Sequence, residues 1–526
     1  MKEKNEIDVH ASVLETITAV LEAEGVMKAG VGDLAVYREA QAPYIGSASA
    51  GIYARSLRRR DEVLCFMARH DGERFFFEVS PTPFESIFTG VSPRRIADLH
   101  VAAVRPVPAA LPGLWDAFPF TRPQSLRDKR STVGMGDRLG VATAGHIRAI
   151  RDYDAYPVLA QQSLREMDYT GRSFPEVVAD ASFGVFQEGF ERGFGADGDH
   201  LKSIDKIDAT LHAGAPMVTL DLTEVLKPEV ADWSAEQVSA SFAELPAEFR
   251  ERVLRDYADR SFDLEGTEVR IDRETLQRCA LLYGEALDFA VAVDRHLKAE
   301  TGDRYDLEIS IDETTTPTLP SHHLFIAREL HTREVTLNSV APRFIGDFQK
   351  GIDYIGNIDE FDAQFDVHCR IAAAFGSYKI SVHSGSDKLS VYPSVGARTG
   401  GRLHLKTAGT SWLEAIRVVA ETDPTLYRLI HAKTLEYYPT ALKSYHITAD
   451  IDTVPSIADM PDADLPGLLE HPAWRQFLHI SYGGLLNDAE VGPKLRRFLF
   501  DHEEEYLAAL ETHFRRHLDA LGLPPA

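Results

Sequence analysis

Eight short apolar runs alternate with longer amphipathic stretches between residues 130 and 424 of this 526-residue chain. The runs occupy 132–136, 156–161, 194–199, 217–221, 307–312, 335–340, 379–383 and 402–407. Strands that alternate with helices pair in parallel through right-handed crossovers, and eight such units in succession close a TIM barrel. We therefore predict an α/β protein whose (β/α)8 barrel covers 126–423. An open doubly wound sheet is the alternative.

On either side of the predicted barrel the sequence does not show this alternation of strand and helix patterns. Residues 1–125 predict an N-terminal α+β extension, with a helix over 8–24 and a hairpin made of VLCFMAR and RFFFEVS around an Asp-Gly turn. The long gap between the fourth and fifth runs predicts a helical insertion at about 225–303. Residues 424–526 are strongly helical in pattern and predict a C-terminal cap of helices.

Composition excludes several classes of partner. The chain carries 56 Lys and Arg against 81 Asp and Glu, a formal charge of −25, which disfavours nucleic acid and anionic membranes. Its three cysteines are far apart, so we expect no disulfide framework and a reducing, cytoplasmic location. No stretch approaches the ~18 apolar residues of a membrane span, and the N-terminus has no apolar signal-peptide core. A small molecule is the expected partner, and the chain is compatible with a homo-oligomer.

Polar residues follow nearly every apolar run. In a barrel these positions meet at the C-terminal ends of the strands, where catalytic groups collect. Loops after strands are polar in general and Asp often caps the next helix, so a structural role is the alternative for each residue. The polar residues at the run ends are Asp137, Arg138, Gln161, Gln162, Asp197, Asp199, His200, Lys202, Asp221, Glu224, Asp312, Glu313, Asn338, Arg343, His383, Ser384, Ser386, Asp387, Lys388, His404, Lys406 and Thr407.

Imidazole and carboxylate groups within this set suit a divalent metal. We predict Glu313 and His383 as ligands, with His200 and His446 next, for zinc, manganese, nickel or iron(II). Motifs for other cofactors are missing: GMGDRLG departs from the dinucleotide fingerprint, no P-loop occurs, and no G-x-S-x-G elbow is present. A nicotinamide is therefore not expected.

Several long blocks resemble the tagaturonate/fructuronate epimerases, a family of metal-dependent sugar-acid epimerases related to tagatose 4-epimerases. The blocks are GMGDRLGVATAGHI, AQQSLRE, FGVFQEGFERGFGADGDHLK, DETTTPT, APRFIGDFQKGIDYIG, SVHSGSDKLSVYP, HLKTAGTSWLEAIR and SYHITAD, in consistent order over roughly 130–450. The resemblance implies interconversion of D-tagaturonate and D-fructuronate, with D-tagatose/D-fructose 4-epimerisation as a related activity. It implies inversion of a hydroxyl-bearing carbon β to the ketone, which simple deprotonation next to the carbonyl cannot achieve. Retro-aldol cleavage, rotation of the aldehyde and re-addition can achieve it.

Under this hypothesis the strand-end residues divide into three groups. Asp199 and Asp137 are the acid/base candidates, and Lys202 is the candidate for steadying a developing oxyanion. The predicted metal ligands would supply the Lewis acid. Eight residues are predicted to contact the substrate. Four form a cationic clamp for its carboxylate, namely Arg138, Arg343, Lys388 and Lys406. The other four are Gln161, Gln162, Ser384 and Asp387.

Two other functions fit the same barrel. A class II aldolase-like lyase acting on a ketose or ketose phosphate would break the same bond and release the fragments. A non-catalytic barrel subunit of a sugar-phosphate enzyme would tolerate erosion of the polar ring, which this sequence keeps.

Overall fold

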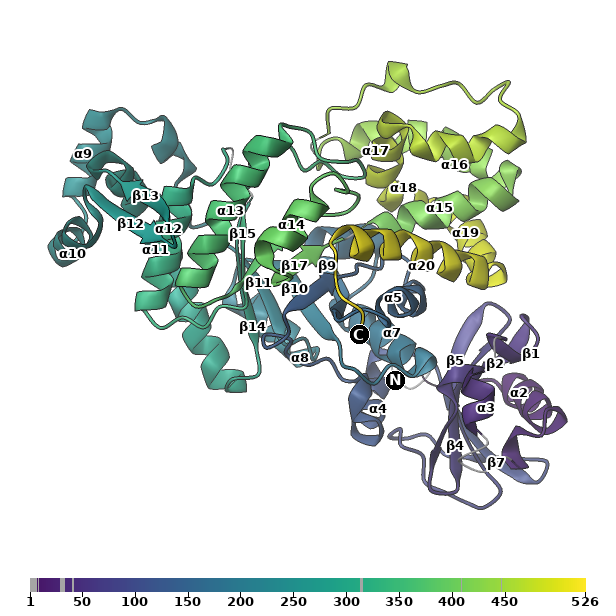
Figure 1. The fold of residues 1–526 in the computed structure, drawn as a ribbon. Helices are drawn as coiled ribbons and strands as arrows, with labels where there is room; N and C mark the ends of the chain where they lie inside the picture. The colour runs from purple at the N-terminus through teal and green to yellow at the C-terminus, as the bar shows by residue number, and fades with distance from the viewer. Residues whose placement is uncertain are drawn as a thin grey trace.

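The centre of the molecule is a closed barrel of eight parallel strands (Figure 1). The structure is a computed structural model that describes residues 7, 9–28, 34–39, 42–312, 316–407, 409–445 and 447–526. In barrel order the strands are β8 (Ser131–Gly134), β9 (Tyr156–Ser163), β10 (Gly195–Leu201), β11 (Met217–Asp221), β14 (Asp306–Ile311), β15 (Ser339–Pro342), β16 (Lys379–Val382) and β17 (Leu403–Lys406). Every predicted run supplies one strand. The barrel is confirmed, and the open-sheet alternative is wrong.

Helices follow the strands and pack around the barrel. α7 shows how the sequence sets their limits: Ser173 and Glu176 form a capping box at its start, and Gly189 closes it in the left-handed conformation. The helices of the barrel layer are α5 (Thr143–Ile150), α6 (Leu164–Thr170), α7 (Phe174–Glu188), α8 (Ile204–His212), α11 (Arg273–Thr301), α12 (Pro320–Thr332), α13 (Ile358–Ala374), α14 (Tyr392–Thr399) and α15 (Thr410–Thr422).

One strand begins later than the sequence predicts. The pattern places it at 335–340, but β15 starts at Ser339. Glu334 has a φ of 59°, and the Val335 N–H donates to a carbonyl in the last turn of α12 at 3.0 Å. The apolar Val335 therefore closes the preceding helix, as apolar residues just after a helix often do, and the strand follows it.

The stretch between β11 and β14 mixes helices with a hairpin. It contains α9 (Ala235–Ala243), α10 (Ala247–Tyr257) and α11, but also the antiparallel pair β12 (Arg260–Leu264) and β13 (Thr267–Ile271). The sequence predicts only helices at about 225–303 and does not predict this hairpin. Its turn residues, Glu265 and Gly266, both have positive φ (52° and 88°), the conformation that two-residue hairpin turns require.

A seven-stranded sheet forms the N-terminal layer (Figure 1). Its central hairpin pairs β4 with β5 around Asp71 and Gly72, as the Asp-Gly signal predicts. Helix α2 packs against this sheet, within the predicted 8–24. The elements of this layer are α2 (Ala11–Ala23), α3 (Leu34–Glu39), β1 (Tyr44–Gly46), β2 (Ala50–Tyr53), β3 (Arg58–Arg60), β4 (Val63–His70), β5 (Glu73–Ser80), β6 (Arg94–Ile96) and β7 (Leu99–Val104), with α4 (Leu111–Ala117) leading on to the barrel.

C-terminal helices cover one side of the barrel and also reach the N-terminal sheet. They are α16 (Pro424–Ala441), α17 (Pro472–Ile480), α18 (Tyr482–Asn487), α19 (Val491–Asp501) and α20 (Glu503–Ala520). α20 packs on α5 and α15. Among the described helices, none is long and apolar enough to cross a membrane.

Glu503, the first residue of α20, joins the two ends of the chain. Its carboxylate accepts from Arg69 of β4 at 2.6 Å and from Arg74 of β5 at 2.5 Å, and Tyr53 donates to it at 2.9 Å. Both Arg69 and Glu503 are almost fully buried. A buried pair of this kind is costly to break, because the remaining charge has no solvent to stabilise it.

Candidate active site

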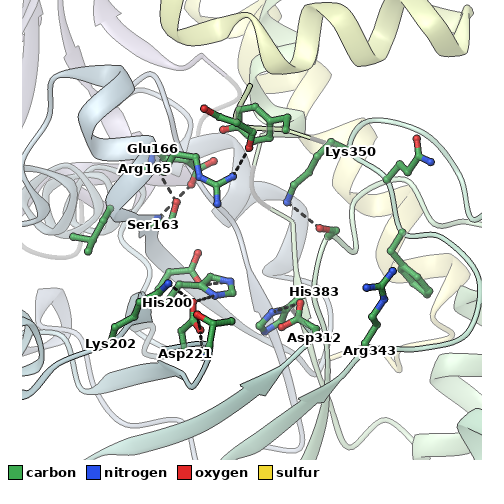
Figure 2. A pocket seen from close by; sticks show the side chains of 18 of the residues that line it. Ser163, Arg165, Glu166, His200, Lys202, Asp221, Asp312, Arg343, Lys350 and His383 are labelled. Carbon is green, nitrogen blue, oxygen red and sulfur yellow. Dashed lines mark hydrogen bonds and ion pairs between the residues drawn. The ribbon is translucent and has the colours of Figure 1, made fainter. Parts of the chain in front are cut away.

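A cavity of about 1040 Å³ lies at the end of the barrel where the strands finish. Residues directly after β9, β10, β11, β14, β15 and β16 line it, together with Ser444 and Tyr445 after α16 (Figure 2). The cavity therefore lies where the argument from strand ends places the site.

Irregular backbone turns two side chains into this cavity. The pairing of β10 with β11 shifts register between Gly198 and Leu201, and His200 within the shift has a φ of 59°. Ser384, just after β16, has a φ of 49°. A bulge re-aims the side chain it carries, and non-glycine residues with positive φ gather where function requires them. Both His200 and Ser384 line the cavity.

Two histidines and their carboxylates face one another across the cavity floor (Figure 2). The rings of His200 and His383 are 5.2 Å apart between centroids. His383 Nε2 is 2.7 Å from Glu308 Oε1, and His383 Nδ1 is 3.0 Å from Asp312 Oδ2. His200 Nδ1 is 3.6 Å from Asp221 Oδ2. The floor thus combines two imidazoles with three carboxylates, two from β14 and its end and one from the end of β11.

The carboxylates set the charge of His383. Burial alone would lower its pKa, but Asp312 and Glu308 on its two sides raise that pKa to about 10. The pKa of Asp312 is correspondingly low, because the neighbouring imidazoles outweigh its desolvation. In this arrangement a positive charge is held between two carboxylates.

A buried lysine supports the floor from inside the barrel. Lys406 Nζ lies 2.7 Å from Asp199 Oδ1, 2.9 Å from Asp197 Oδ2 and 3.0 Å from Glu308 Oε1. Against the cost of burial, these charges keep the pKa of Lys406 well above its ordinary value, and Lys406 keeps the pKa of Glu308 well below its own. Asp199 also lines the cavity, so its carboxylate connects the buried lysine to the cavity.

Several predicted site residues lie in the cavity lining, and their proposed roles stay predictions. They come from the ends of β8, β10, β15 and β16 and are Arg138, Asp199, His200, Lys202, Arg343, His383 and Ser384. Lys202 Nζ lies 3.6 Å from Asp221 and 4.0 Å from Glu224. Ser384 Oγ accepts from Lys350 Nζ at 2.9 Å.

Arg138 lines the cavity, but its guanidinium is already engaged. It donates to Glu166 Oε1 at 2.6 Å and to the His479 carbonyl at 3.2 Å, and it stacks on the Tyr482 ring at 3.8 Å. The arginine ties the β8 end to α6, α17 and α18. It acts here as a buried cross-link, and its predicted place in a carboxylate clamp stays a prediction.

Three more predicted residues are outside the described lining of the cavity. Asp137 accepts from the backbone N–H groups of Leu139, Gly140 and Ala142 at 2.7–2.9 Å and so caps the loop after β8, which argues against an acid/base role. Gln161 and Gln162 are buried in the barrel wall. Neither contributes to the described lining, so substrate contact is not supported for them.

The other predicted clamp residues also have structural partners. Lys388 is fully buried and donates to the carbonyls of Gln349, Ile352 and Ser386 at 2.5–2.9 Å. Lys406 is taken up by the three carboxylates of the floor. Asp387 pairs with Arg475 at 2.8 Å and lines a different cavity. None of the three is in the described lining of the active-site cavity, and their predicted contacts with the substrate stay predictions.

Two predicted metal ligands, Glu313 and His446, lie outside the described residues. The structure adds Glu308, Glu166 and Lys350 to the site, which the strand-end argument missed. Glu308 could have been found, since polar residues alternate with apolar ones along DLEISID and so point into the barrel. Lys350 lies in a loop with no such signal.

Comparison with known proteins identifies relatives of the whole barrel. A profile of the tagaturonate epimerase family matches residues 53–521. The tagaturonate/fructuronate epimerase of Thermotoga maritima is 41% identical over 392 residues, which cover 74% of this chain and 81% of that protein. Crystal structures of the fructuronate-tagaturonate epimerase of Cohnella laeviribosi, native and with one bound glycerol, are 39% identical. Each has a TM-score of 0.86 and covers 90% of this chain and 97% of the other.

Proposed function

This chain belongs to the tagaturonate epimerase family, and we propose that it interconverts D-tagaturonate and D-fructuronate in the cavity at the barrel mouth. An epimerase is an isomerase, and family membership favours this activity over the lyase and the non-catalytic subunit. The observation that supports the proposal within the chain is the floor of the cavity. It places His200, His383 and Asp199 beside a space large enough for a six-carbon sugar acid.

The proposed reaction is a retro-aldol cleavage followed by aldol addition. A base removes the proton of the β-hydroxyl group, the bond between the α and β carbons breaks, and its electron pair passes into an enediolate. The β carbon becomes an aldehyde. After the aldehyde rotates, the enediolate adds to its opposite face and the proton returns to the new alkoxide, so that atoms and electrons balance. No redox cofactor is needed.

Asp199 is the acid/base group that the geometry favours. Burial would raise its pKa, but Lys406 and His200 hold that pKa below its ordinary value, so Asp199 enters the reaction as a carboxylate. Lys406 fixes one of its oxygens at 2.7 Å. Lys202, on the rim of the same wall, is the candidate for stabilising negative charge that develops on oxygen.

We propose that a divalent metal ion also binds at this floor. His383 Nδ1 is buried 3.0 Å from Asp312 Oδ2, and a bound ion would take the place of the proton that the imidazolium holds between them. His200, His383, Asp312 and Asp221 would hold the ion, and nitrogen and oxygen donors suit zinc, manganese, nickel or iron(II). When bound, it would supply a Lewis acid for the enediolate oxygens.

Arg343 and Lys350 are the proposed binding groups for the uronate carboxylate. Both line the cavity on the side opposite Lys202 (Figure 2), and both lie between β15 and α13. Lys350 is held by Ser384 at 2.9 Å. Arg138, Lys388 and Lys406 have other partners, so the clamp proposed here keeps Arg343 of the four predicted members and adds Lys350.

Proton NMR of the zinc- or manganese-reconstituted protein with D-tagaturonate tests the proposal. We expect D-fructuronate to form, the reverse reaction to reach the same ratio, and a chelator to stop both. Free three-carbon fragments in place of the epimer would show the lyase instead. No change in the sugar acid with metal present would overturn the proposal.

D-Tagatose serves as the matched substrate without a carboxylate. If Arg343 binds that group, Arg343→Gln should raise KM for tagaturonate by about 10- to 100-fold and leave any turnover of tagatose unchanged, because a charge-assisted bidentate contact is lost from one substrate only. Equal effects on both sugars would remove Arg343 from the clamp.

A further inference from the structure

A second cavity of about 630 Å³ lies behind the loop that joins β16 to α14. Parts of α15, α17 and α20 enclose it, and its lining contains six carboxylate residues against three arginines. Asp387 faces this cavity, while Ser384 of the same loop faces the active-site cavity. The negative balance of the lining favours a cation.

Two histidines of α20 stand beside Asp387. His513 and His517 are four residues apart and so lie on one face of the helix, one turn from each other. Asp387 Oδ1 is 3.8 Å from His513 Nε2 and 3.9 Å from His517 Nε2. One ligand atom from each of the three residues lies within 4.8 Å of the other two.

The hydrogen bonds of the two rings fix where their lone pairs point. His517 Nδ1 is 2.9 Å from the His513 carbonyl, which can only accept, so Nδ1 carries the hydrogen and Nε2 carries the lone pair. The Asp387 N–H donates to that Nε2 at 3.0 Å, which agrees with this tautomer. His513 Nδ1 lies 3.3 Å from Glu414 Oε1, and a hydrogen on Nδ1 satisfies that carboxylate.

His513 Nε2 is then left with a lone pair that faces the Asp387 carboxylate. His513 is 5% exposed, and its Nε2 has no hydrogen-bond partner among the described residues. Two acceptors that face each other in a buried place repel unless a cation lies between them. Rings that donate Nδ1–H to a carboxylate or a carbonyl and present Nε2 are also how proteins orient histidines toward metals.

We propose that Asp387, His513 and His517 form a second metal site, which binds a divalent ion such as Zn²⁺ apart from the active site. Ligands about 2.1 Å from tetrahedral zinc lie roughly 3.4 Å from one another, close to the distances that separate these atoms. Arg475 occupies Asp387 Oδ2 and leaves Oδ1 for the ion. Water from the cavity completes the coordination, and the His517 Nε2 lone pair exchanges its backbone partner for the metal.

A bound ion would fasten the β16–α14 loop to α20. That loop begins beside His383, carries Ser384 in the active-site cavity, and contains Lys388, which holds the 349–352 segment by its carbonyls. The site is therefore structural, and its existence does not depend on which sugar the barrel converts.

Zinc stoichiometry by mass spectrometry tests the site. The full-length protein is stripped with a chelator, loaded with Zn²⁺ and desalted, and His513→Gln is compared with the matched variant His502→Gln at the start of the same helix. We expect His513→Gln to hold one zinc ion per chain fewer than the wild type and His502→Gln to hold the same number. Equal zinc in His513→Gln and wild type would overturn the proposal.

A cobalt spectrum decides the question if His513→Gln does not fold. In the His383→Gln protein, which removes a proposed active-site ligand, Co²⁺ bound at the second site should still give visible d–d absorption, and adding His517→Gln should abolish it. No visible absorption in the His383→Gln protein would refute the second site. Loss of epimerase activity with the absorption intact would bear only on the barrel mouth.

Discussion

The two ends of the barrel each bury a lysine, and the two lysines are held in opposite ways. Lys406, at the C-terminal end of β17, is surrounded by Asp197, Asp199 and Glu308. Lys379, at the N-terminal end of β16, donates instead to the Leu126 carbonyl at 2.9 Å and to Asn338 Oδ1 at 2.7 Å. The pKa of Lys406 is raised well above its ordinary value, whereas burial lowers the pKa of Lys379 to about 8.

The difference separates an electrostatic role from a packing role. A lysine among carboxylates keeps its charge and lowers the pKa of the carboxylates around it. One of the carboxylates around Lys406, that of Asp199, lines the cavity. A lysine among carbonyls only satisfies hydrogen bonds and can lose its proton. Burial and residue type are the same at both ends, so the partners alone decide which role applies.

The largest effect is expected for Lys406→Met. Three buried carboxylates would lose their counter-ion, so we expect the free energy of unfolding to fall by about 3–5 kcal/mol and kcat to fall at least ~100-fold. Urea unfolding and NMR turnover measure the two. Lys379→Met, which removes the lysine at the other end, is the control; equal losses in both variants would show that the carboxylate partners do not matter.

The Lys379→Met variant should differ from the wild type in a pH-dependent way. Below about pH 8 this lysine is charged in both folded and unfolded chains; between pH 8 and about 10.4 it is neutral when folded and charged when unfolded. The unfolded chain then binds more protons, so wild-type stability rises with pH relative to the variant, by about 3 kcal/mol across the window. Urea midpoints at pH 7 and pH 10 measure it. If the unfolding free energy of the wild type minus that of the variant falls as the pH rises, the low pKa of Lys379 is contradicted.

A second change should partly repair the loss of Lys406. Asp197 is buried beneath the cavity, and Asp197→Asn in the Lys406→Met background removes one of the three unpaired charges. We expect it to restore about 2 kcal/mol of unfolding free energy, although in the wild-type background it should destabilise. A double-mutant cycle by urea unfolding measures the coupling, and additive effects would argue against it.

The smallest effect is expected for Lys388→Met. Its ammonium is buried among three carbonyls, and burial lowers its pKa to about 7, which places it with Lys379 rather than with Lys406. We expect a loss of about 1–2 kcal/mol, with kcat reduced less than in Lys406→Met. Thermal unfolding and turnover at pH 8 check this. A loss of activity as large as that of Lys406→Met would place Lys388 in the site after all.

Most of the fold follows from periodicity in the sequence. Eight apolar runs at β-strand length gave eight strands, because a barrel strand buried on both faces has little freedom to be anything else. Val335 misled the pattern because one apolar residue can close a helix as well as begin a strand. The hairpin at Glu265 and Gly266 was missed because its strands are short and largely exposed.

The site is less readable, because strand ends show where polar groups gather but not what they contact. Asp137, Lys388 and Arg138 have the chemistry of site residues, yet backbone groups and Glu166 occupy them. Those partners come from distant segments that sequence alone does not bring together. The spacing of His513 and His517 is visible in the sequence. Asp387, the third proposed ligand, lies 126 residues before His513, and only folding brings it beside the two histidines.

The Arg69–Glu503 contact has a consequence for synthesis on the ribosome. The two residues are 434 positions apart, and at roughly 5–20 residues per second the carboxylate is made about 20–90 seconds after the arginine. During that interval the N-terminal sheet has emerged with Arg69 and Arg74 still lacking their partner. The first layer of the protein to be made is thus among the last to be completed, when α20 brings Glu503 to its two arginines.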